Sequence, residues 1–280
     1  MTNNSLFKLS IVIPFLNESK IIDSLFSELL NVLHTHNYNY RVICVDNNSR
    51  DSTLDQLYKY QTRIKNIDIV SFSQYFGKEA AIQAGLNIAD GDCCVIMDPD
   101  LEDPPECIPK FIEKWKEGFE IVFAKRSNKI NIWNPKSLLN FLFYHFFNLI
   151  SDVKIPNQTG DFRLLDKKVY SVLNQLPEKT RFMRGLCSWL GFKTTFITFH
   201  RPTRKKGKSK SNYRFLWIYS LNALFSSTIR PLQIWSYFGF FISIVSFLFG
   251  LYILCSVLFF GDVIPGYAST IIIVSFLGGI

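Results

Sequence analysis

Short apolar runs, each followed at once by polar residues, recur along the first half of the chain and constrain its fold more than any other feature. The runs alternate with helical patterns, and they cover residues 9–14, 41–45, 67–72, 93–97 and 121–124. Strands that alternate with helices at this spacing are typical of a mostly parallel sheet with helices on both faces. The sequence therefore predicts an α/β fold.

The polar clusters that end these runs are predicted to meet at one edge of the sheet. They lie at Asn17–Glu18, Asp46–Asn48, Asp98–Asp100 and Arg126. In open α/β sheets, ligands bind outside the carboxyl ends of the strands. Each cluster alone is compatible with ordinary loop chemistry, but their convergence indicates a binding site.

Residues 98–106 carry the clearest chemical signal. Asp98 and Asp100 directly follow the run 93–97, and Pro104 and Pro105 then begin a new helix, as proline is tolerated in a helix's first turn. Carboxylates at i and i+2 suit Mg²⁺ or Mn²⁺, hard cations that prefer oxygen ligands and often serve substrate phosphates. A solvated acidic turn is the alternative for this spacing taken alone.

The C-terminal part of the chain is apolar. No residue between Arg230 and Asp262 is charged, and about 20 apolar residues are enough to span a bilayer. We expect a transmembrane helix over residues 231–261. The apolar run over 265–280 is too short to span by itself, and we expect it to be the start of a second transmembrane helix that the chain end cuts off.

The net charge of +8 is concentrated just before this apolar segment, at Arg201, Arg204, Lys205, Lys206, Lys208, Lys210 and Arg214. Basic residues beside a span stay cytoplasmic and attract anionic headgroups. We therefore expect residues 1–212 to form a cytoplasmic domain, which would be the catalytic one if the chain is an enzyme, on a multi-pass protein of the inner membrane. A nucleic-acid patch is the alternative, and a membrane span so close in sequence disfavours it, so we expect no nucleic-acid partner.

Two more segments are too apolar for solvent-facing helices. Residues 133–150 form either a buried core helix or a helix that lies in the headgroup region, and a membrane-anchored chain favours the second. Residues 213–230 show the same character directly ahead of the first span. We predict two interfacial amphipathic helices there.

A basic set is predicted to hold a second phosphate, beside the one that the metal would serve. Arginine gives bidentate contacts to phosphate, and the set comprises Arg163, Arg204 and Lys210. The metal pair, the basic residues and the membrane-facing segments together suggest a reaction between a charged soluble substrate and a lipid. If the lipid is a phosphate and acts as acceptor, it is already anionic, so no strong base is required and Asp161 could orient groups instead. A structural ion pair between Asp161 and Arg163 is the alternative.

Taken together, these segments resemble family 2 glycosyltransferases of the branch that uses polyprenyl phosphate, which includes dolichol-phosphate mannose synthase and the bacterial bactoprenol glucosyl transferases. The resemblance runs in family order over residues 11–210. It is carried by residues 11–18, 45–53, 76–81, 97–106 and 160–164, and by Arg204 with Gly207, Ser209 and Lys210. Residues 76–81 and the two expected spans favour the bacterial branch.

The resemblance implies a GT-A fold and an inverting, metal-dependent sugar transfer to polyprenyl phosphate, with Mg²⁺ or Mn²⁺ as cofactor. It implies that the nucleotide sugar contacts Pro14, Leu16, Glu18, Val45, Asp46, Asn47, Lys78, Asp98, Pro99, Asp100 and Arg126. It assigns the metal to Asp98, Asp100 and Glu102, catalysis to Asp161 and Asp100, and the lipid phosphate or diphosphate to Arg126, Arg163, Arg204 and Lys210.

By branch, the resemblance implies UDP-glucose as donor, with UDP-N-acetylhexosamine or GDP-mannose as alternatives. The product would serve surface polysaccharide modification, and bacterial members are often homotetramers. Membrane lipids are expected partners. A polymerising synthase and a non-catalytic membrane scaffold are the alternative functions, which the small number of spans and the retained motifs respectively disfavour.

The chain departs from the family pattern at three places. Glu102 replaces a usual Gln, which adds a negative charge beside the expected metal. Asn47 and Asn48 replace a usual Asp-Gly pair, although an amide can still pair with a uracil edge. Leu16 replaces a common Tyr and removes a stacking partner.

Overall fold

The computed structural model describes residues 7–127, 159–178, 182–200 and 230–261, together with residues 266, 270, 271, 273 and 274. The chain divides into two compact units, Met1–Ser227 and Thr228–Ile280. Each unit is described by itself below.

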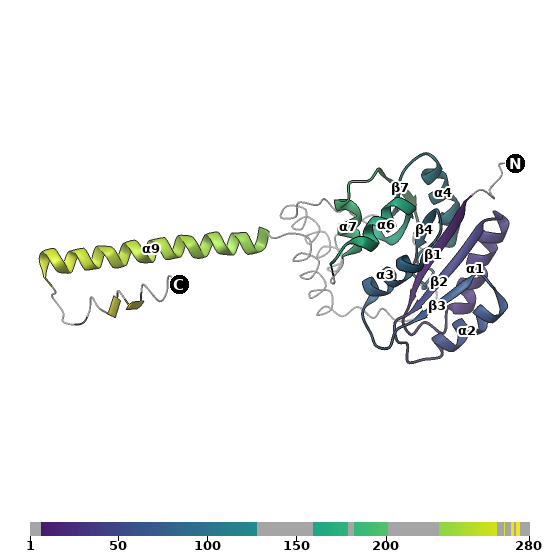
Figure 1. Ribbon diagram of the computed structural model, residues 1–280, viewed down its shortest axis with the longest axis horizontal. Coiled ribbons are helices and arrows are strands. Elements are labelled where there is room, and N and C mark those ends of the chain that lie inside the picture. The colour runs from purple at the N-terminus through teal and green to yellow at the C-terminus, as the bar shows by residue number, and fades with distance from the viewer. Residues whose placement is uncertain are drawn as a thin grey trace. The chain divides into compact units, whose positions relative to one another are not determined.

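A seven-stranded mixed sheet with the order β3-β2-β1-β4-β6-β5-β7 forms the centre of the first unit (Figure 1). β1 runs parallel to both β2 and β4, and β2 runs parallel to β3. β6 is antiparallel to both of its neighbours, β4 and β5, while β7 pairs in parallel with β5 at the edge. The strands are β1 Lys8–Phe15, β2 Asn39–Asp46, β3 Ile67–Ser71, β4 Cys93–Ile96, β5 Ile121–Arg126, β6 Thr159–Asp166 and β7 Thr194–Phe199.

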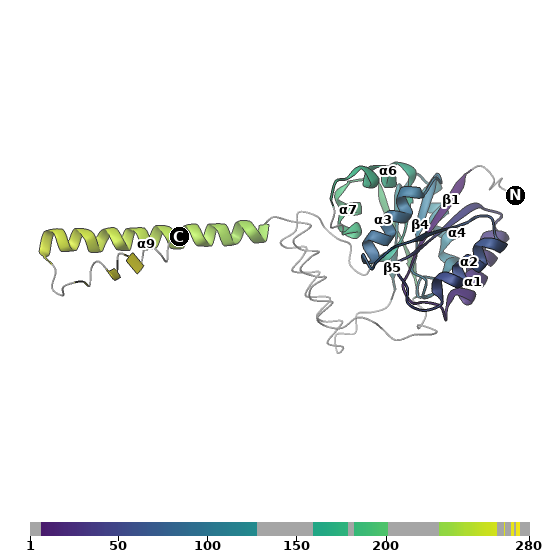
Figure 2. The same cartoon turned by 60° about the horizontal axis from the view of Figure 1, so that its bottom comes forward.

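Helices cover both faces of the sheet (Figure 2). The helices of one face are α1 Ile22–Thr35, α2 Thr53–Arg63 and α4 Ile108–Lys116, which follows a short 3₁₀ turn at Pro105–Cys107. Those of the other face are α3 Lys78–Ile88, α6 Lys167–Gln175 and α7 Met183–Trp189. Each set buries its apolar stripe against the sheet, which gives two hydrophobic clusters and three layers.

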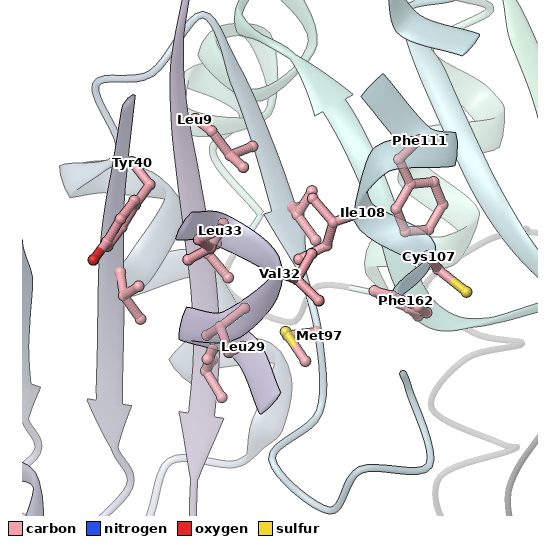
Figure 3. Close-up of a cluster of buried hydrophobic side chains, with 14 of the residues drawn as sticks. Leu9, Leu29, Val32, Leu33, Tyr40, Met97, Cys107, Ile108, Phe111 and Phe162 are labelled. Atoms are coloured by element: carbon pink, nitrogen blue, oxygen red, sulfur yellow. The ribbon is translucent and has the colours of Figure 1, made fainter. Parts of the chain in front are cut away.

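The two clusters explain why the strands are almost continuously apolar in sequence. Along β1, Ile11 and Ile13 belong to the cluster under α1 and α4, whereas Val12 belongs to the cluster under α3 and α6. Successive side chains of a strand point to opposite faces, so a sheet covered on both sides needs apolar residues at nearly every position. Figure 3 shows the first cluster, where Leu29 of α1 and Phe111 of α4 point toward the sheet.

The prediction of an α/β fold is confirmed, but the sheet is less parallel than expected. The sequence indicated no strand over residues 159–166, because Asp161, Arg163 and Asp166 interrupt the apolar pattern. The structure places β6 there, between β4 and β5 and antiparallel to both. The charges of Asp161 and Arg163 are tolerated inside the sheet because each has oppositely charged or polar partners, described below.

Gly85 of α3 marks the closest approach of this helix to the sheet. A Cβ atom at this position would lie 2.3 Å from Cγ1 of Val12, which is fully buried in β1. We therefore expect Gly85→Ala to lower the free energy of unfolding by about 1–3 kcal/mol through overpacking. The shift of the unfolding midpoint of the purified protein measures this effect.

The matched control is a double variant in which the side chain of Val12 is also shortened. Adding Gly85→Ala to Val12→Ala should cost less stability than adding it to the wild type, because the nearest atom of residue 12 is then Cβ at 3.2 Å instead of Cγ1 at 2.3 Å. A Gly85→Ala variant as stable as the wild type would contradict this close packing.

The second unit is dominated by one long helix, α9, which covers Arg230–Phe260. Its segment Leu232–Phe259 has no charged residue and contains an 18-residue stretch with a mean hydropathy of 2.4, and its large side chains are exposed. By length and composition α9 can cross a bilayer, and within the described parts of the chain it is the one helix that can.

The other predicted membrane segments are not tested. The predicted helices over 133–150 and 213–229 lie outside the described residues, as does most of 265–280. The multi-pass topology and the predicted domain boundaries therefore stay predictions.

Candidate active site

The register of the strands explains how polar residues distant in sequence meet at one edge of the sheet. Phe15 at the end of β1 pairs with Asp46 at the end of β2. In β4, Ile96 pairs with both Val12 of β1 and Arg163 of the antiparallel β6. Continuing the β4–β6 register by two residues sets Asp98 opposite Asp161.

An open pocket lies at this edge and has a volume of about 190 Å³. Its lining comes from the ends of β1, β2 and β4, from the loop that precedes α3 and from the first residue of α3. The lining residues are Pro14, Phe15, Leu16, Glu18, Asn47, Tyr75, Lys78, Asp98, Pro99 and Asp100. All but Phe15 and Tyr75 were predicted from the sequence to contact the nucleotide sugar.

Three residues of that predicted set do not line the pocket. Val45 is fully buried between the sheet and α3. Asp46 is also buried, at the end of β2. Arg126 lies at the end of β5, where its Nη2 atom is 3.3 Å from the position that a Cβ of Gly160 would take. Its Nε atom is buried and has no hydrogen-bond partner among the described residues.

The end of β2 presents a buried acceptor. Oδ2 of Asp46 accepts a hydrogen bond of 3.1 Å from the backbone N–H of Ser49. Its Oδ1 has no hydrogen-bond partner within the described part of the chain. Oδ1 of Asn47 accepts from the backbone N–H of Phe76 at 2.9 Å. Asn48 has a φ of +61°, a left-handed conformation that asparagine tolerates well, so the Asn47–Asn48 pair suits this turn.

Lys78 connects the two acidic positions of the site. Its Nζ atom lies 2.6 Å and 2.7 Å from the two carboxylate oxygens of Asp98, and 2.6 Å from Oδ2 of Asp161. Burial alone would lower the pKa of the ammonium group, but the negative charges of Asp161 and Asp98 outweigh burial and raise it above its usual value. Lys78 is therefore a fixed positive charge, and its side chain is 41% exposed where it lines the pocket.

Asp161 is the centre of a buried cluster of charges. Besides Lys78, its carboxylate contacts Nε of Arg184 at 2.8 Å and Nη2 of Arg163 at 3.1 Å. Burial alone would raise the pKa of this carboxyl group, but Arg184, Lys78 and Arg163 together hold it well below the usual range. Asp161 therefore stays ionised at neutral pH and is poorly suited to accept a proton there.

The expected contact of Arg163 with a phosphate is corrected by the structure. Arg163 is fully buried, and its Nε and Nη1 atoms donate to the backbone carbonyls of Asp161 and Met183 at 3.0 Å and 3.2 Å. Its guanidinium group has no surface for a ligand in this arrangement. The structural ion pair with Asp161 is the reading that the geometry supports. Arg204 and Lys210 lie outside the described residues.

Asp98 and Asp100, two of the three predicted metal ligands, fit a divalent cation. Both line the pocket and offer the oxygen donors that Mg²⁺ or Mn²⁺ prefers, and one or two carboxylates beside substrate phosphates are sufficient for such a site. The backbone of Glu102, rather than its side chain, donates to Asp100, after a left-handed residue at Leu101. Within the described residues no group of three or more metal-ligating side chains is assembled, and the assignment of Glu102 to the metal stays a prediction.

The buried side chain of Asp103 holds the backbone of this acidic turn. Its Oδ2 accepts a hydrogen bond of 3.1 Å from the backbone N–H of Asp98. Burial, together with the nearby charge of Asp98, raises the pKa of Asp103 to about 8. A protonated Asp103 avoids adding a further negative charge to the turn at neutral pH.

Apart from the buried Phe15, two residues of the site were not predicted from the sequence. Arg184, a lone charged residue in the short helix α7, contacts Asp161, and its position among apolar neighbours was a usable signal. Tyr75 lines the pocket just before the segment 76–81 that carried the resemblance. Neither residue belonged to a motif considered in the sequence.

The fold and this edge of the sheet define a class of protein. A pocket of acidic and basic side chains lies at the carboxyl ends of the strands, where open α/β sheets bind their ligands. The family model described as glycosyl transferase family 2 matches residues 10–173, more than half of the chain. The chain therefore belongs to glycosyltransferase family 2, and it is a glycosyltransferase.

Curated relatives match nearly the whole chain. It is 42% identical to an uncharacterised glycosyltransferase of Synechocystis over 98% of this chain and 86% of the relative. It is 35% identical to the bactoprenol glucosyl transferase of Shigella phage SfV, over 98% of this chain and 89% of that protein. A prophage bactoprenol glucosyl transferase homologue of Escherichia coli is 34% identical, with the same coverage. The predicted membership of this family and branch is confirmed.

Solved structures support the fold. Glucosyl-3-phosphoglycerate synthase from Mycobacterium tuberculosis, in complex with Mn²⁺, UDP and glucosyl-3-phosphoglycerate, matches with a TM-score of 0.53 and 17% identity over 78% of each chain. At this identity the match shows the fold alone. The mixed α/β sheet therefore has structural neighbours among glycosyltransferases of the GT-A type.

Proposed function

We propose that this glycosyltransferase moves glucose from UDP-glucose to polyprenyl phosphate at the cytoplasmic face of a membrane, for modification of a surface polysaccharide. The observation that carries the proposal is the pocket, where residues predicted to hold a nucleotide sugar come together from separate segments of the chain. The names of the relatives, the UDP-bound structural neighbour and the apolar helix α9 support it.

The chain's own residues suggest how the diphosphate leaving group is handled. Lys78 would place a positive charge beside the diphosphate, since it lines the pocket and Asp161 holds it in place. Asp98 and Asp100 would hold a divalent cation, which when bound neutralises charge on the leaving diphosphate. Asp161 thus acts by positioning Lys78 and Arg184 rather than by accepting a proton.

The acceptor needs no base in this scheme. A phosphate monoester is anionic at neutral pH, so one of its oxygens can attack the anomeric carbon as the bond to the nucleoside diphosphate breaks. A single displacement of this kind inverts the configuration at the anomeric carbon. The low pKa of Asp161 agrees with this scheme, because that carboxylate is not available as a general base at neutral pH.

The membrane arrangement is part of the same proposal. We place α9 across the bilayer and the sheet domain in the cytoplasm, with residues 265–280 as the start of a second span. Arg204 and Lys210 are proposed to contact the lipid phosphate, and Arg126 the diphosphate. The homotetramer stays a prediction.

A transfer assay tests the proposed function. The purified full-length chain in detergent is incubated with polyprenyl phosphate, Mg²⁺ or Mn²⁺, and a panel of radiolabelled UDP- and GDP-sugars. We expect label from UDP-glucose in the organic phase, and we expect a chelator and Asp100→Asn each to abolish it. Asp90→Asn is the matched control, because Asp90 pairs with Lys8 and Arg41 outside the pocket.

The same assay separates the alternatives. Label from another nucleotide sugar would mean that this sugar, and not UDP-glucose, is the donor. Label in an aqueous polymer would indicate a polymerising synthase. No transfer from any donor by a folded protein would contradict the proposed function and favour a scaffold.

A further inference from the structure

We infer that the ring of Tyr75 is the surface on which the base of the donor nucleotide stacks. The inference rests on the proposed function, because it takes the pocket to be the nucleotide site. It adds a binding residue that lies outside every motif considered in the sequence.

The exposure of the two aromatic side chains in the pocket points to Tyr75. Phe15 is 1% exposed, so its ring is covered by the core. Tyr75 is 55% exposed, although it lies in the wall of the pocket. A large ring left open beside a pocket offers apolar area at little cost in side-chain entropy, since tyrosine has only two side-chain torsions.

Backbone hydrogen bonds hold the loop of Tyr75 against the end of β2. The backbone N–H of Phe72 donates to the carbonyl of Asp46, and that of Phe76 donates to Oδ1 of Asn47, each at 2.9 Å. The rings of Phe72 and Phe76 also meet edge to face, with centroids 5.3 Å apart. Tyr75, between these two anchors, is therefore fixed next to Asn47.

The neighbours of Tyr75 complete the requirements of a nucleotide. Oδ1 of Asp46 is a buried carboxylate oxygen without a partner among the described residues, and it suits an N–H on the edge of a base. Lys78 follows Tyr75 by three residues and supplies a positive charge for phosphates. The pocket thus combines a ring face and a cation, and the buried carboxylate of Asp46 directly precedes Asn47, which lines the pocket.

Stacking and edge contacts make different contributions to the binding of a base. Every base has a π-face, so stacking on an aromatic side chain contributes affinity with little discrimination. We therefore assign affinity for the base to Tyr75, and discrimination among bases to the polar groups of Asp46 and Asn47.

Isothermal titration of the full-length chain in detergent with UDP in the presence of Mn²⁺ tests the inference. Tyr75→Ala is expected to weaken UDP binding roughly five- to a hundredfold, the range for loss of one base–aromatic stack. Tyr75→Phe should bind within about twofold of the wild type, because the ring is kept. Tyr58→Ala is the matched control, since Tyr58 is an exposed tyrosine of α2 that does not line the pocket.

Pyrophosphate with Mn²⁺ serves as a second ligand that has no base. Its binding should be the same for the wild type and Tyr75→Ala. Equal losses for UDP and pyrophosphate would overturn the inference, because they would mean that the substitution disturbs the phosphate site. A full loss in Tyr75→Phe would overturn it as well, since the hydroxyl and not the ring would then carry the contact.

The titrations also separate this inference from the proposed function. If the wild type binds UDP and Tyr75→Ala binds it equally well, the inference fails and the proposed function stands. If the folded wild type does not bind UDP, the inference and the UDP-sugar specificity fail together.

Discussion

Replacing Asp161 with asparagine is expected to abolish sugar transfer and to lower the free energy of unfolding by about 3–5 kcal/mol, the usual cost of removing one partner of a buried ion pair. Asp161 contacts Lys78, Arg163 and Arg184. Asparagine keeps the shape of the side chain but not its charge, so fully buried Arg163 would lose its counter-ion. Unfolding midpoints and the transfer assay measure the two effects.

The control for this substitution is again Asp90→Asn. The carboxylate of Asp90 is 45% exposed and pairs with Lys8, and exposed pairs contribute about 0–1 kcal/mol. A stable Asp161→Asn variant that retains transfer would contradict the role given to Asp161 as the anchor of the cluster.

The pH dependence of stability provides a further check on the same residue. The pKa of Asp161 is lower in the folded protein than its usual value of about 3.9. Its contribution to stability is therefore present above about pH 4 and is lost as the pH falls through the lower folded value. The stability difference between wild type and Asp161→Asn should shrink in that acidic range, whereas a difference that grows there would contradict the charge cluster.

Replacing Lys78 with methionine is expected to lower kcat roughly 10²- to 10³-fold, the usual effect of removing one preorganised group that stabilises developing charge. The ammonium group of Lys78 lies in the pocket between Asp98 and Asp161, where a leaving diphosphate would gain negative charge. Methionine has a similar length but no charge. Steady-state kinetics of sugar transfer measure the change.

Lys114→Met is the matched control for Lys78→Met. Lys114 pairs with Glu117 on the exposed side of α4, outside the pocket, and its loss should leave kcat unchanged. Turnover of the Lys78→Met variant near the wild-type value would exclude Lys78 from stabilisation of the leaving group.

Much of the pocket could be predicted from the sequence because the end of each strand is visible as the end of an apolar run. Pro14, Asp98 and Asn47 each follow or end an apolar run, and the carboxyl ends of parallel strands meet at one edge. That prediction needs only local patterns and one topological rule.

The position and environment of β6 could not be predicted in the same way. A strand that contains Asp161 and Arg163 is compatible with burial only when distant residues pair with these side chains. Lys78 of α3 and Arg184 of α7 neutralise Asp161, and the backbone carbonyl of Met183 accepts a hydrogen bond from Arg163. No local pattern shows that these segments pack together. For the same reason, Arg163 was expected at a phosphate although the fold encloses it.

Tyr75 was missed for a different reason. Its loop has no periodic pattern, and its place depends on hydrogen bonds from Phe72 and Phe76 to the end of β2. Such tertiary hydrogen bonds are invisible in one sequence, whereas the exposure of the ring is evident once the pocket is formed.

A structure of this protein bound to UDP and Mn²⁺ tests whether the pocket is the nucleotide site. We expect UDP in the pocket between β1, β2 and β4, with its base against Tyr75 and its diphosphate beside Lys78. UDP bound elsewhere, with Lys78 still bridging Asp98 and Asp161 beside an unoccupied pocket, would contradict it.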